Sequence, residues 1–138
     1  ISGTSAGASI QSEKMITGDG LIDTVYDVTF DVLWNGNIEL VEGLGLLDSV
    51  IIDQHFVVRS RHNRLLSAVI ENPGYQGVGI DEGTAILVSG DTATVYGASQ
   101  VLTFTNPASI TSPKDSLLNG RDIRVSIYLP GEKFAIKR

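Results

Sequence analysis

The chain has 138 residues, no cysteine and a formal net charge of −6 at pH 7. This length suits one domain with its own hydrophobic core. The lack of cysteine excludes a disulfide framework, a thiol nucleophile and a cysteine-based metal site, and the negative charge disfavours binding to nucleic acid or to anionic membranes.

The first motif in the chain is Gly3-Thr4-Ser5-Ala6-Gly7, which fits the G-x-S-x-G pattern of a nucleophile elbow. In such an elbow, a serine lies on a tight strand-to-helix turn with its hydroxyl exposed. We expect both glycines to be needed because larger residues would collide in so sharp a turn. The start of the helix would leave N–H groups beside the serine for a developing oxyanion. The alternative is an ordinary turn of small residues.

Only four residues precede Ser5, whereas a nucleophile elbow normally follows a strand. We therefore expect the chain to be the C-terminal part of a larger protein. The alternative is a complete small domain in which Ser5 lies in a frayed terminus.

The next elements are less sharply patterned. Residues 8–15 could continue a short helix, which the turn residues at 17–20 would end. Residues 25–34 alternate in part and could form a hairpin with residues 38–41 across Asn35-Gly36. A short helix would accommodate some of the same apolar positions.

The middle of the chain predicts an α/β arrangement. The β-branched residues 50–52 predict a buried parallel strand, and residues 65–72 have helical spacing up to Asn72-Pro73-Gly74. Residues 77–80 form another short apolar run. Each strand ends in polar residues.

Strands dominate the remainder of the predicted structure. Residues 85–88 and 92–96 predict a hairpin, and residues 100–104 predict a further strand. A surface loop is expected at 105–119. We also expect residues 123–129 to pair with residues 133–136 across Pro130-Gly131.

Serine-based acyl transfer requires a hydroxyl, an imidazole and an acid that orients the imidazole. Of the two histidines, His62 falls among arginines on an expected solvated helical face, whereas His55 follows the strand at 50–52. Glu82 follows the strand at 77–80 in the same way. Ser5, His55 and Glu82 are thus all expected along one rim of the sheet.

Each of these residues has an alternative interpretation. His55 could be a buried histidine bonded to a backbone carbonyl, and Glu82 could be an ordinary loop carboxylate. Asp81 competes with Glu82 for the role of the acid. The three arginines at 59, 61 and 64 could be a solvated helix start that pairs with nearby acids such as Asp53.

Together these motifs closely resemble the serine peptidase family that contains cyanophycinases and aspartyl dipeptidases. The resemblance spans nearly all of the chain and is strongest at Asp53-Gln54-His55-Phe56 with the arginines that follow. It also includes Gly3-Thr4-Ser5-Ala6-Gly7-Ala8 and Gly79-Ile80-Asp81-Glu82. Ser2 replaces the glycine usual in the family. The implied fold is the C-terminal part of a glutamine-amidotransferase-like (flavodoxin-like) three-layer α/β sandwich, with β-rich C-terminal strands and with the N-terminal half outside residues 1–138.

The resemblance implies roles for individual residues. Ser5 would be the nucleophile, His55 the general base and then acid, and Glu82 the group that orients His55; the N–H of Ala6 would serve the oxyanion hole. The implied reaction releases β-Asp-Arg dipeptides from cyanophycin, a poly-aspartate with arginine on its side chains, through an acyl-enzyme. The residues expected to bind this substrate are Asp53, Gln54, Arg59, Arg61 and Arg64.

Two alternatives remain within this resemblance. The chain could be an aspartyl dipeptidase with the same triad and a smaller pocket, or a non-catalytic fragment that is active only with its N-terminal half. A self-cleaved hydrolase with an N-terminal nucleophile is disfavoured because Ile1 is first. We expect a homodimer in the cytoplasm, with secretion as the alternative, and no nucleic acid, membrane, metal or cofactor.

Overall fold

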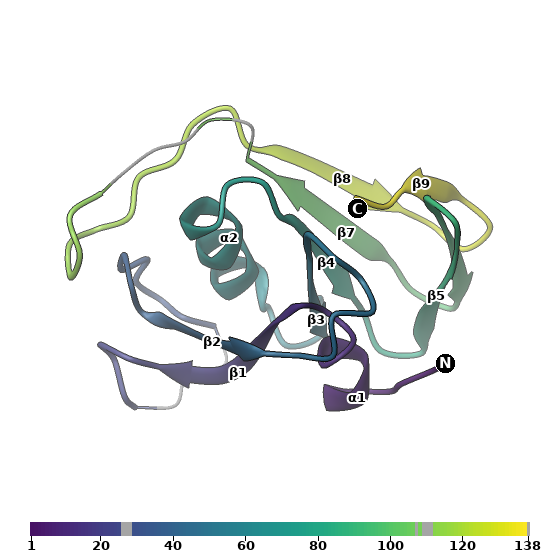
Figure 1. The fold of residues 1–138 in the computed structure, drawn as a ribbon, viewed down its shortest axis with the longest axis horizontal. Helices are drawn as coiled ribbons and strands as arrows, with labels where there is room; N and C mark the ends of the chain where they lie inside the picture. The colour runs from purple at the N-terminus through teal and green to yellow at the C-terminus, as the bar shows by residue number, and fades with distance from the viewer. Residues whose placement is uncertain (26–28, 107, 109–111, 138) are drawn as a thin grey trace.

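The computed structural model describes residues 1–25, 29–106, 108 and 112–137. It is an α/β structure in which strands outnumber helices among these residues (Figure 1). In chain order the elements are α1 (Ala6–Ser9), β1 (Lys14–Gly20), β2 (Ile38–Glu42), β3 (Val50–Gln54), α2 (His62–Glu71), β4 (Gln76–Ile80), β5 (Thr84–Ser89), β6 (Thr92–Gly97), β7 (Val101–Thr105), β8 (Arg124–Tyr128) and β9 (Lys133–Ala135).

A central sheet has the strand order β3-β4-β7-β8. Strands β3 and β4 are parallel, and the other two pairings are antiparallel. A second sheet, β5-β6-β9, and the pair β1-β2 complete the described strands. The buried parallel strand predicted at 50–52 is confirmed, as are the strands predicted at 77–80 and 100–104, the hairpin β5-β6 and the helix α2.

The central sheet separates two apolar clusters. On one face, Ile51, Leu102 and Phe104 pack with residues of α2, β1 and β2. On the other face, Val50 and Ile52 pack with residues of β6 and β9, among others. Successive side chains of a strand point to opposite faces, so β3 contributes to both clusters.

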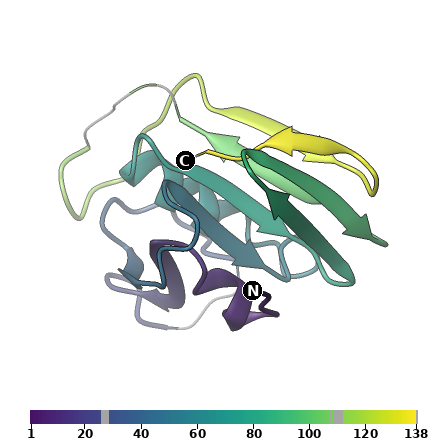
Figure 2. The same ribbon diagram turned by 45° about the vertical axis from the view of Figure 1, so that its right-hand side comes forward.

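This arrangement gives three layers, as predicted, with α2 and β9 on opposite sides of the central sheet (Figures 1 and 2). The predicted β-rich C-terminal part is also confirmed by strands β5 to β9. One outer layer is itself an antiparallel sheet. The flavodoxin-like assignment stays a prediction.

Two glycines on β4 let this sheet approach its helical layer. A Cβ on Gly77 would lie 2.7 Å from Cγ2 of Val69 on α2, and a Cβ on Gly79 would lie 2.4 Å from the ring of Phe56. Both distances are too short for real contacts, so only glycine permits this packing. Phe56, which is fully buried, directly follows His55.

Three local predictions were wrong. The helix α1 ends at Ser9, and β1 occupies part of the predicted helix 8–15 and all of the turn expected at 17–20. Strand β2 pairs with β1 rather than with residues 25–34, of which 26–28 lie outside the described residues. Strands β8 and β9 belong to different sheets, because β8 pairs with β7 and β9 with β6. In all three cases long-range pairing decides the outcome.

Candidate active site

Ser5 lies in a tight turn immediately before α1. Its backbone has φ 52° and ψ −126°, in a region that residues other than glycine rarely occupy. The carbonyl of Ser5 accepts a hydrogen bond from the N–H of Ala8 at 2.8 Å, which closes the first turn of α1. Ser5 is exposed, so its hydroxyl is accessible, as in a nucleophile elbow.

The two glycines of the motif behave differently. A Cβ on Gly3 would lie 1.9 Å from the carbonyl oxygen of Gly7, so the expected collision is real at this position. A Cβ on Gly7 would meet no atom within 4 Å. The steric argument for two obligatory glycines was therefore wrong for Gly7, which lies on the open side of α1.

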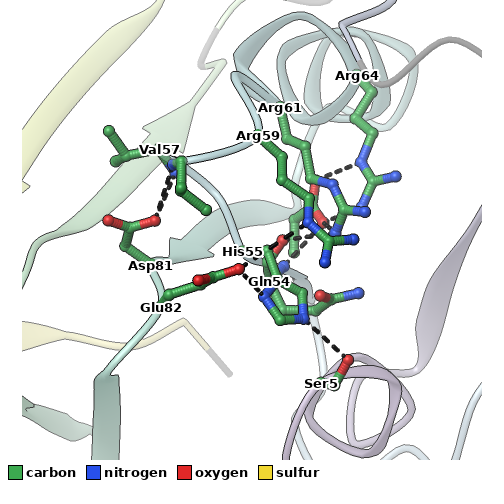
Figure 3. A network of polar contacts seen from close by, with 11 residues as sticks. Ser5, Gln54, His55, Val57, Arg59, Arg61, Arg64, Asp81 and Glu82 are labelled. Carbon is green, nitrogen blue, oxygen red and sulfur yellow. Dashed lines mark hydrogen bonds and ion pairs between the residues drawn. The ribbon is translucent and has the colours of Figure 1, made fainter.

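His55 lies between Ser5 and Glu82 (Figure 3). Its Nε2 is 3.1 Å from Oγ of Ser5, and its Nδ1 is 2.7 Å from Oε1 of Glu82. An ionised carboxylate only accepts hydrogen bonds, so Nδ1 carries the proton in this pair and a neutral ring leaves Nε2 as the acceptor for the serine hydroxyl. The three side chains form one continuous chain of hydrogen bonds.

The parallel pairing of β3 with β4 brings His55 and Glu82 together. Gln54 at the end of β3 is in register with Ile80 at the end of β4, so both chains leave the sheet at the same edge. His55 then has φ 50°, a left-handed backbone that turns its ring toward Ser5 and Glu82. The predicted placement of polar groups at strand ends thus agrees with this geometry.

Asp81, the alternative acid, faces elsewhere. Its Oδ1 accepts hydrogen bonds from the N–H groups of Val57 and Val58, both at 3.0 Å, and its Oδ2 accepts one from the hydroxyl of Ser99 at 2.6 Å. Burial alone would raise the pKa of Asp81, but hydrogen bonds from Ser99 and from the backbone outweigh it and the pKa is lowered. In this structure, Glu82 and not Asp81 is the partner of His55.

Asp53, Arg61 and Arg64 form a buried group beneath the site. Arg64 donates from Nε to Oδ2 of Asp53 at 2.7 Å and from Nη2 to Oδ1. Arg61 donates from Nη1 to the backbone carbonyl of Gln54 at 2.7 Å, and the same atom lies 3.8 Å from Oδ1 of Asp53. All three side chains are at most 5 % exposed.

The expected role of these three residues in binding substrate does not agree with this burial, because their charged groups face one another. The alternative interpretation, in which arginines pair with Asp53, describes Arg64 and Arg61, although they are buried rather than solvated. Burying a bidentate pair between the strand end and α2 instead fixes the backbone that carries His55.

Arg59 and Gln54 keep positions suited to contact with a ligand. The side chain of Arg59 is 45 % exposed, and its Nε lies 4.0 Å from Oε1 of Glu82. Gln54 lines the cleft described below, and its Oε1 is buried without a hydrogen-bond partner among the described residues.

The hydrogen-bonded chain opens into a cleft of about 870 Å³. Its walls come from residues 1–5, from the ends of β3 and β4, and from the edge strand β5. Ser5, His55 and Glu82 provide a polar end, whereas Ile86 and Val88 of β5 provide an apolar wall. The volume is in the range of sites for small ligands or short peptides.

Other residues that shape the site were not predicted. The hydroxyl oxygen of Ser12, fully buried, accepts a hydrogen bond from the N–H of Ile52 at 3.0 Å and so links the segment after α1 to β3. No local sequence signal marks Ser12 or Ser99. His62 packs against Phe56, with ring centroids 4.8 Å apart, so its predicted solvated position was only partly right.

Within the described ranges, no helix is long and apolar enough to cross a membrane. The same residues contain no group of three or more histidine or acidic side chains placed to hold a metal ion.

Comparison with known sequences gives a consistent set of matches. Residues 1–96 match the family model for Peptidase family S51. The chain is 33 % identical over 141 residues to a cyanophycinase of Trichormus variabilis, a match that covers 97 % of this chain. It is 37 % identical over 116 residues, or 83 % of the chain, to a cyanophycinase of Synechococcus elongatus. A cyanophycinase of Geminocystis herdmanii is 30 % identical over 143 residues, 97 % of the chain.

These relatives are considerably longer than the matched region. The chain spans 44 %, 31 % and 48 % of their respective lengths. The family match includes the segments that carry Ser5, His55 and Glu82.

Proposed function

The chain belongs to peptidase family S51, and we propose that it carries the catalytic residues of a serine-type exopeptidase that degrades cyanophycin. The observation that supports this proposal most directly is the continuous hydrogen-bonded chain Ser5–His55–Glu82 at the polar end of a cleft. A hydroxyl, an imidazole and a carboxylate in this order are the groups that acyl transfer requires.

In the proposed reaction, Nε2 of His55 accepts the proton of Ser5 as Oγ attacks the substrate carbonyl. Glu82 keeps the proton on Nδ1 and stabilises the imidazolium that forms. His55 then gives its proton to the leaving amine, and the carbonyl remains as an ester on Ser5. Water, deprotonated by His55, hydrolyses this acyl-enzyme and restores the serine hydroxyl.

The N–H of Ala6 is proposed to bind the oxyanion. Ala6 is the first residue of α1, so its N–H has no partner within the helix, and none among the described residues. The loss of one such donor typically lowers turnover by about 10²–10³-fold.

Substrate recognition is proposed to involve Arg59 and Gln54. The exposed guanidinium of Arg59 suits a substrate carboxylate. The unpartnered Oε1 of Gln54 can accept a hydrogen bond from a peptide N–H or from the guanidinium of a β-Asp-Arg unit. We propose that Asp53, Arg61 and Arg64 hold the backbone of this segment in place and do not touch substrate, because their side chains are buried and paired with one another.

An aspartyl dipeptide is the alternative substrate. The number of arginines does not separate the two substrates, since Arg61 and Arg64 are buried. We propose cyanophycin rather than an aspartyl dipeptide as the substrate because the matched relatives are named cyanophycinases. Since those relatives are longer, we further propose that an N-terminal half of the same protein completes the groove and that the whole acts as a homodimer.

The test is release of β-Asp-Arg from purified cyanophycin, measured for the wild-type protein and for Ser5→Ala. Ser126→Ala is the matched control, since Ser126 is an exposed serine on β8 that does not line the cleft. We expect release by the wild type and by Ser126→Ala, and a loss of about 10⁶-fold in Ser5→Ala.

The same preparations are then assayed with β-aspartyl dipeptides. If the protein hydrolyses the dipeptides but not cyanophycin, the aspartyl dipeptidase interpretation replaces the cyanophycinase interpretation. Activity that survives in Ser5→Ala would exclude the proposed nucleophile. If the chain is inactive but gains activity when an N-terminal half is added, the fragment interpretation holds and the Ser5 comparison is repeated on that assembly.

A further inference from the structure

Three consecutive residues at the end of β4 bind the segment that begins with His55. The carbonyl of Ile80 accepts a hydrogen bond from the N–H of Phe56 at 3.2 Å. The carboxylate of Asp81 accepts from the N–H groups of Val57 and Val58, and that of Glu82 binds the ring of His55. Two neighbouring carboxylates thus face opposite ways, one toward the ring and one toward the backbone (Figure 3).

The bonds made by Asp81 are well suited to fix a turn. One oxygen, Oδ1, accepts from both N–H groups at 3.0 Å, and the other is occupied by the hydroxyl of Ser99 at 2.6 Å. Hydrogen bonds to an ionised carboxylate are about twice as strong as those between neutral groups. The lowered pKa of Asp81 agrees with a carboxylate that these donors, together with the N–H of Glu82, keep ionised.

The turn that Asp81 holds needs such support. His55 has φ 50°, a conformation that is unfavourable for a residue other than glycine and persists only when surrounding contacts enforce it. Val57 and Val58 lie just after His55, so releasing their N–H groups would let the backbone at His55 relax. Such a relaxation would move the imidazole away from Ser5 and Glu82.

We propose that Asp81 is a positioning residue, whose carboxylate holds the turn after β3 so that His55 is aligned between Ser5 and Glu82. This proposal rests on the proposed function, in which His55 is the base, but the alignment itself can be measured without catalysis. Asp81 touches neither the imidazole nor Ser5 through any hydrogen bond among the described residues.

The experiment measures the ring ¹⁵N signals of histidine in the folded protein, since these report which nitrogen carries the proton. The His55 signals are identified by their absence in His55→Gln. In the wild type we expect Nδ1 protonated and bonded to Glu82. In Asp81→Ala we expect the averaged signals of a histidine free in water. Asp81→Asn retains a carbonyl oxygen for both N–H groups, and we expect it to restore most of the wild-type pattern.

Glu71→Ala is the matched control. Glu71 is also a half-buried carboxylate that accepts a backbone N–H, from Gly36 at 2.9 Å, but it contacts no residue of the His55 turn by hydrogen bond. This variant also loses a hydrogen bond between a half-buried carboxylate and a backbone N–H, but its His55 signals should stay unchanged.

Turnover provides a second readout. With cyanophycin as substrate, we expect Asp81→Ala to lower kcat by on the order of 10²-fold with little change in KM, because the base is misplaced rather than the pocket. If neither the wild-type chain nor its assembly with an N-terminal half has turnover, the proposed function fails, yet the ¹⁵N comparison still decides the role of Asp81. If Asp81→Ala does not fold, Asp81→Ser replaces it, since its short hydroxyl cannot reach both N–H groups. Unchanged His55 signals in a folded Asp81→Ala or Asp81→Ser protein would overturn the proposal.

Discussion

Arg64 donates two hydrogen bonds to the carboxylate of Asp53, and both side chains are almost completely buried. This pair joins α2 to the end of β3, one residue before Gln54 and two before His55. Its burial separates the arginines of this segment into supports, Arg61 and Arg64, and one exposed cation, Arg59.

The first prediction contrasts Arg64→Met with Arg59→Met. Removing Arg64 leaves the carboxylate of Asp53 buried without its main partner, which should cost about 3–5 kcal/mol in free energy of unfolding. Arg59→Met removes an exposed charge and should change this free energy by less than about 1 kcal/mol. Urea denaturation followed by circular dichroism measures both.

The same two variants separate structural from substrate roles. Arg59→Met should raise KM for a substrate that carries carboxylates, at nearly unchanged stability. An Arg64→Met protein of wild-type stability, with only a raised KM, would restore the direct role in substrate binding expected from the sequence.

The second prediction concerns the elbow. Gly3→Ala places a Cβ 1.9 Å from the carbonyl oxygen of Gly7, so the backbone that carries Ser5 must shift. We expect the rate of labelling of Ser5 by a fluorophosphonate to fall on the order of 10²-fold. Gly7→Ala meets no atom within 4 Å and should label at the wild-type rate. Equal labelling of the two variants would contradict the steric difference between the glycines.

The third prediction concerns the packing of Phe56 on β4. Gly79→Ala brings a Cβ to 2.4 Å from the Phe56 ring and should lower the free energy of unfolding by about 1–3 kcal/mol through overpacking. Phe56→Leu creates space at the same point, so the double variant should lose less than the sum of the single losses. Thermal denaturation of all four proteins measures this coupling, and strict additivity would show that the two positions are independent.

The fourth prediction is a pH dependence of stability. Burial raises the pKa of Glu71 above its ordinary value of 4.5, and the hydrogen bond from the N–H of Gly36 offsets this only in part. A raised pKa in the folded state means that the charged form disfavours folding at neutral pH, and that protonation relieves the effect as pH falls through the raised pKa.

Glu71→Gln has no charge at this position and keeps a carbonyl oxygen for Gly36. We therefore expect it to be more stable than the wild type at pH 7, with the difference closing as pH falls and absent below about 4.5. Chemical denaturation at a series of pH values provides the measurement. A difference that stays constant from pH 7 to pH 4 would show that the charge of Glu71 does not matter.

Local pattern was enough to predict several parts of this protein. The tight turn at Ser5 before α1, the apolar strands β3 and β4 with polar ends, the helix α2 and the hairpin β5-β6 all depend on residues close together in the chain. Their turn residues and periodicity act over a few positions, which is the range at which sequence patterns are informative. Because parallel strands end at a shared edge, the proximity of His55 and Glu82 could also be predicted.

The tertiary structure alone decided which strands pair and which charges are buried. Residues 123–129 and 133–136 looked like one hairpin, but β8 pairs with β7 and β9 pairs with β6, so the two strands join different sheets. The sequence spacing of Arg61 and Arg64 is also compatible with arginines on a solvated surface. Only the contact of both side chains with the buried carboxylate of Asp53 shows that they are buried. Likewise, Asp81 and Glu82 are adjacent and chemically similar, and the path of the backbone determines that one holds the turn and the other holds His55. Burial and facing direction depend on contacts between distant segments, and no local pattern carries that information.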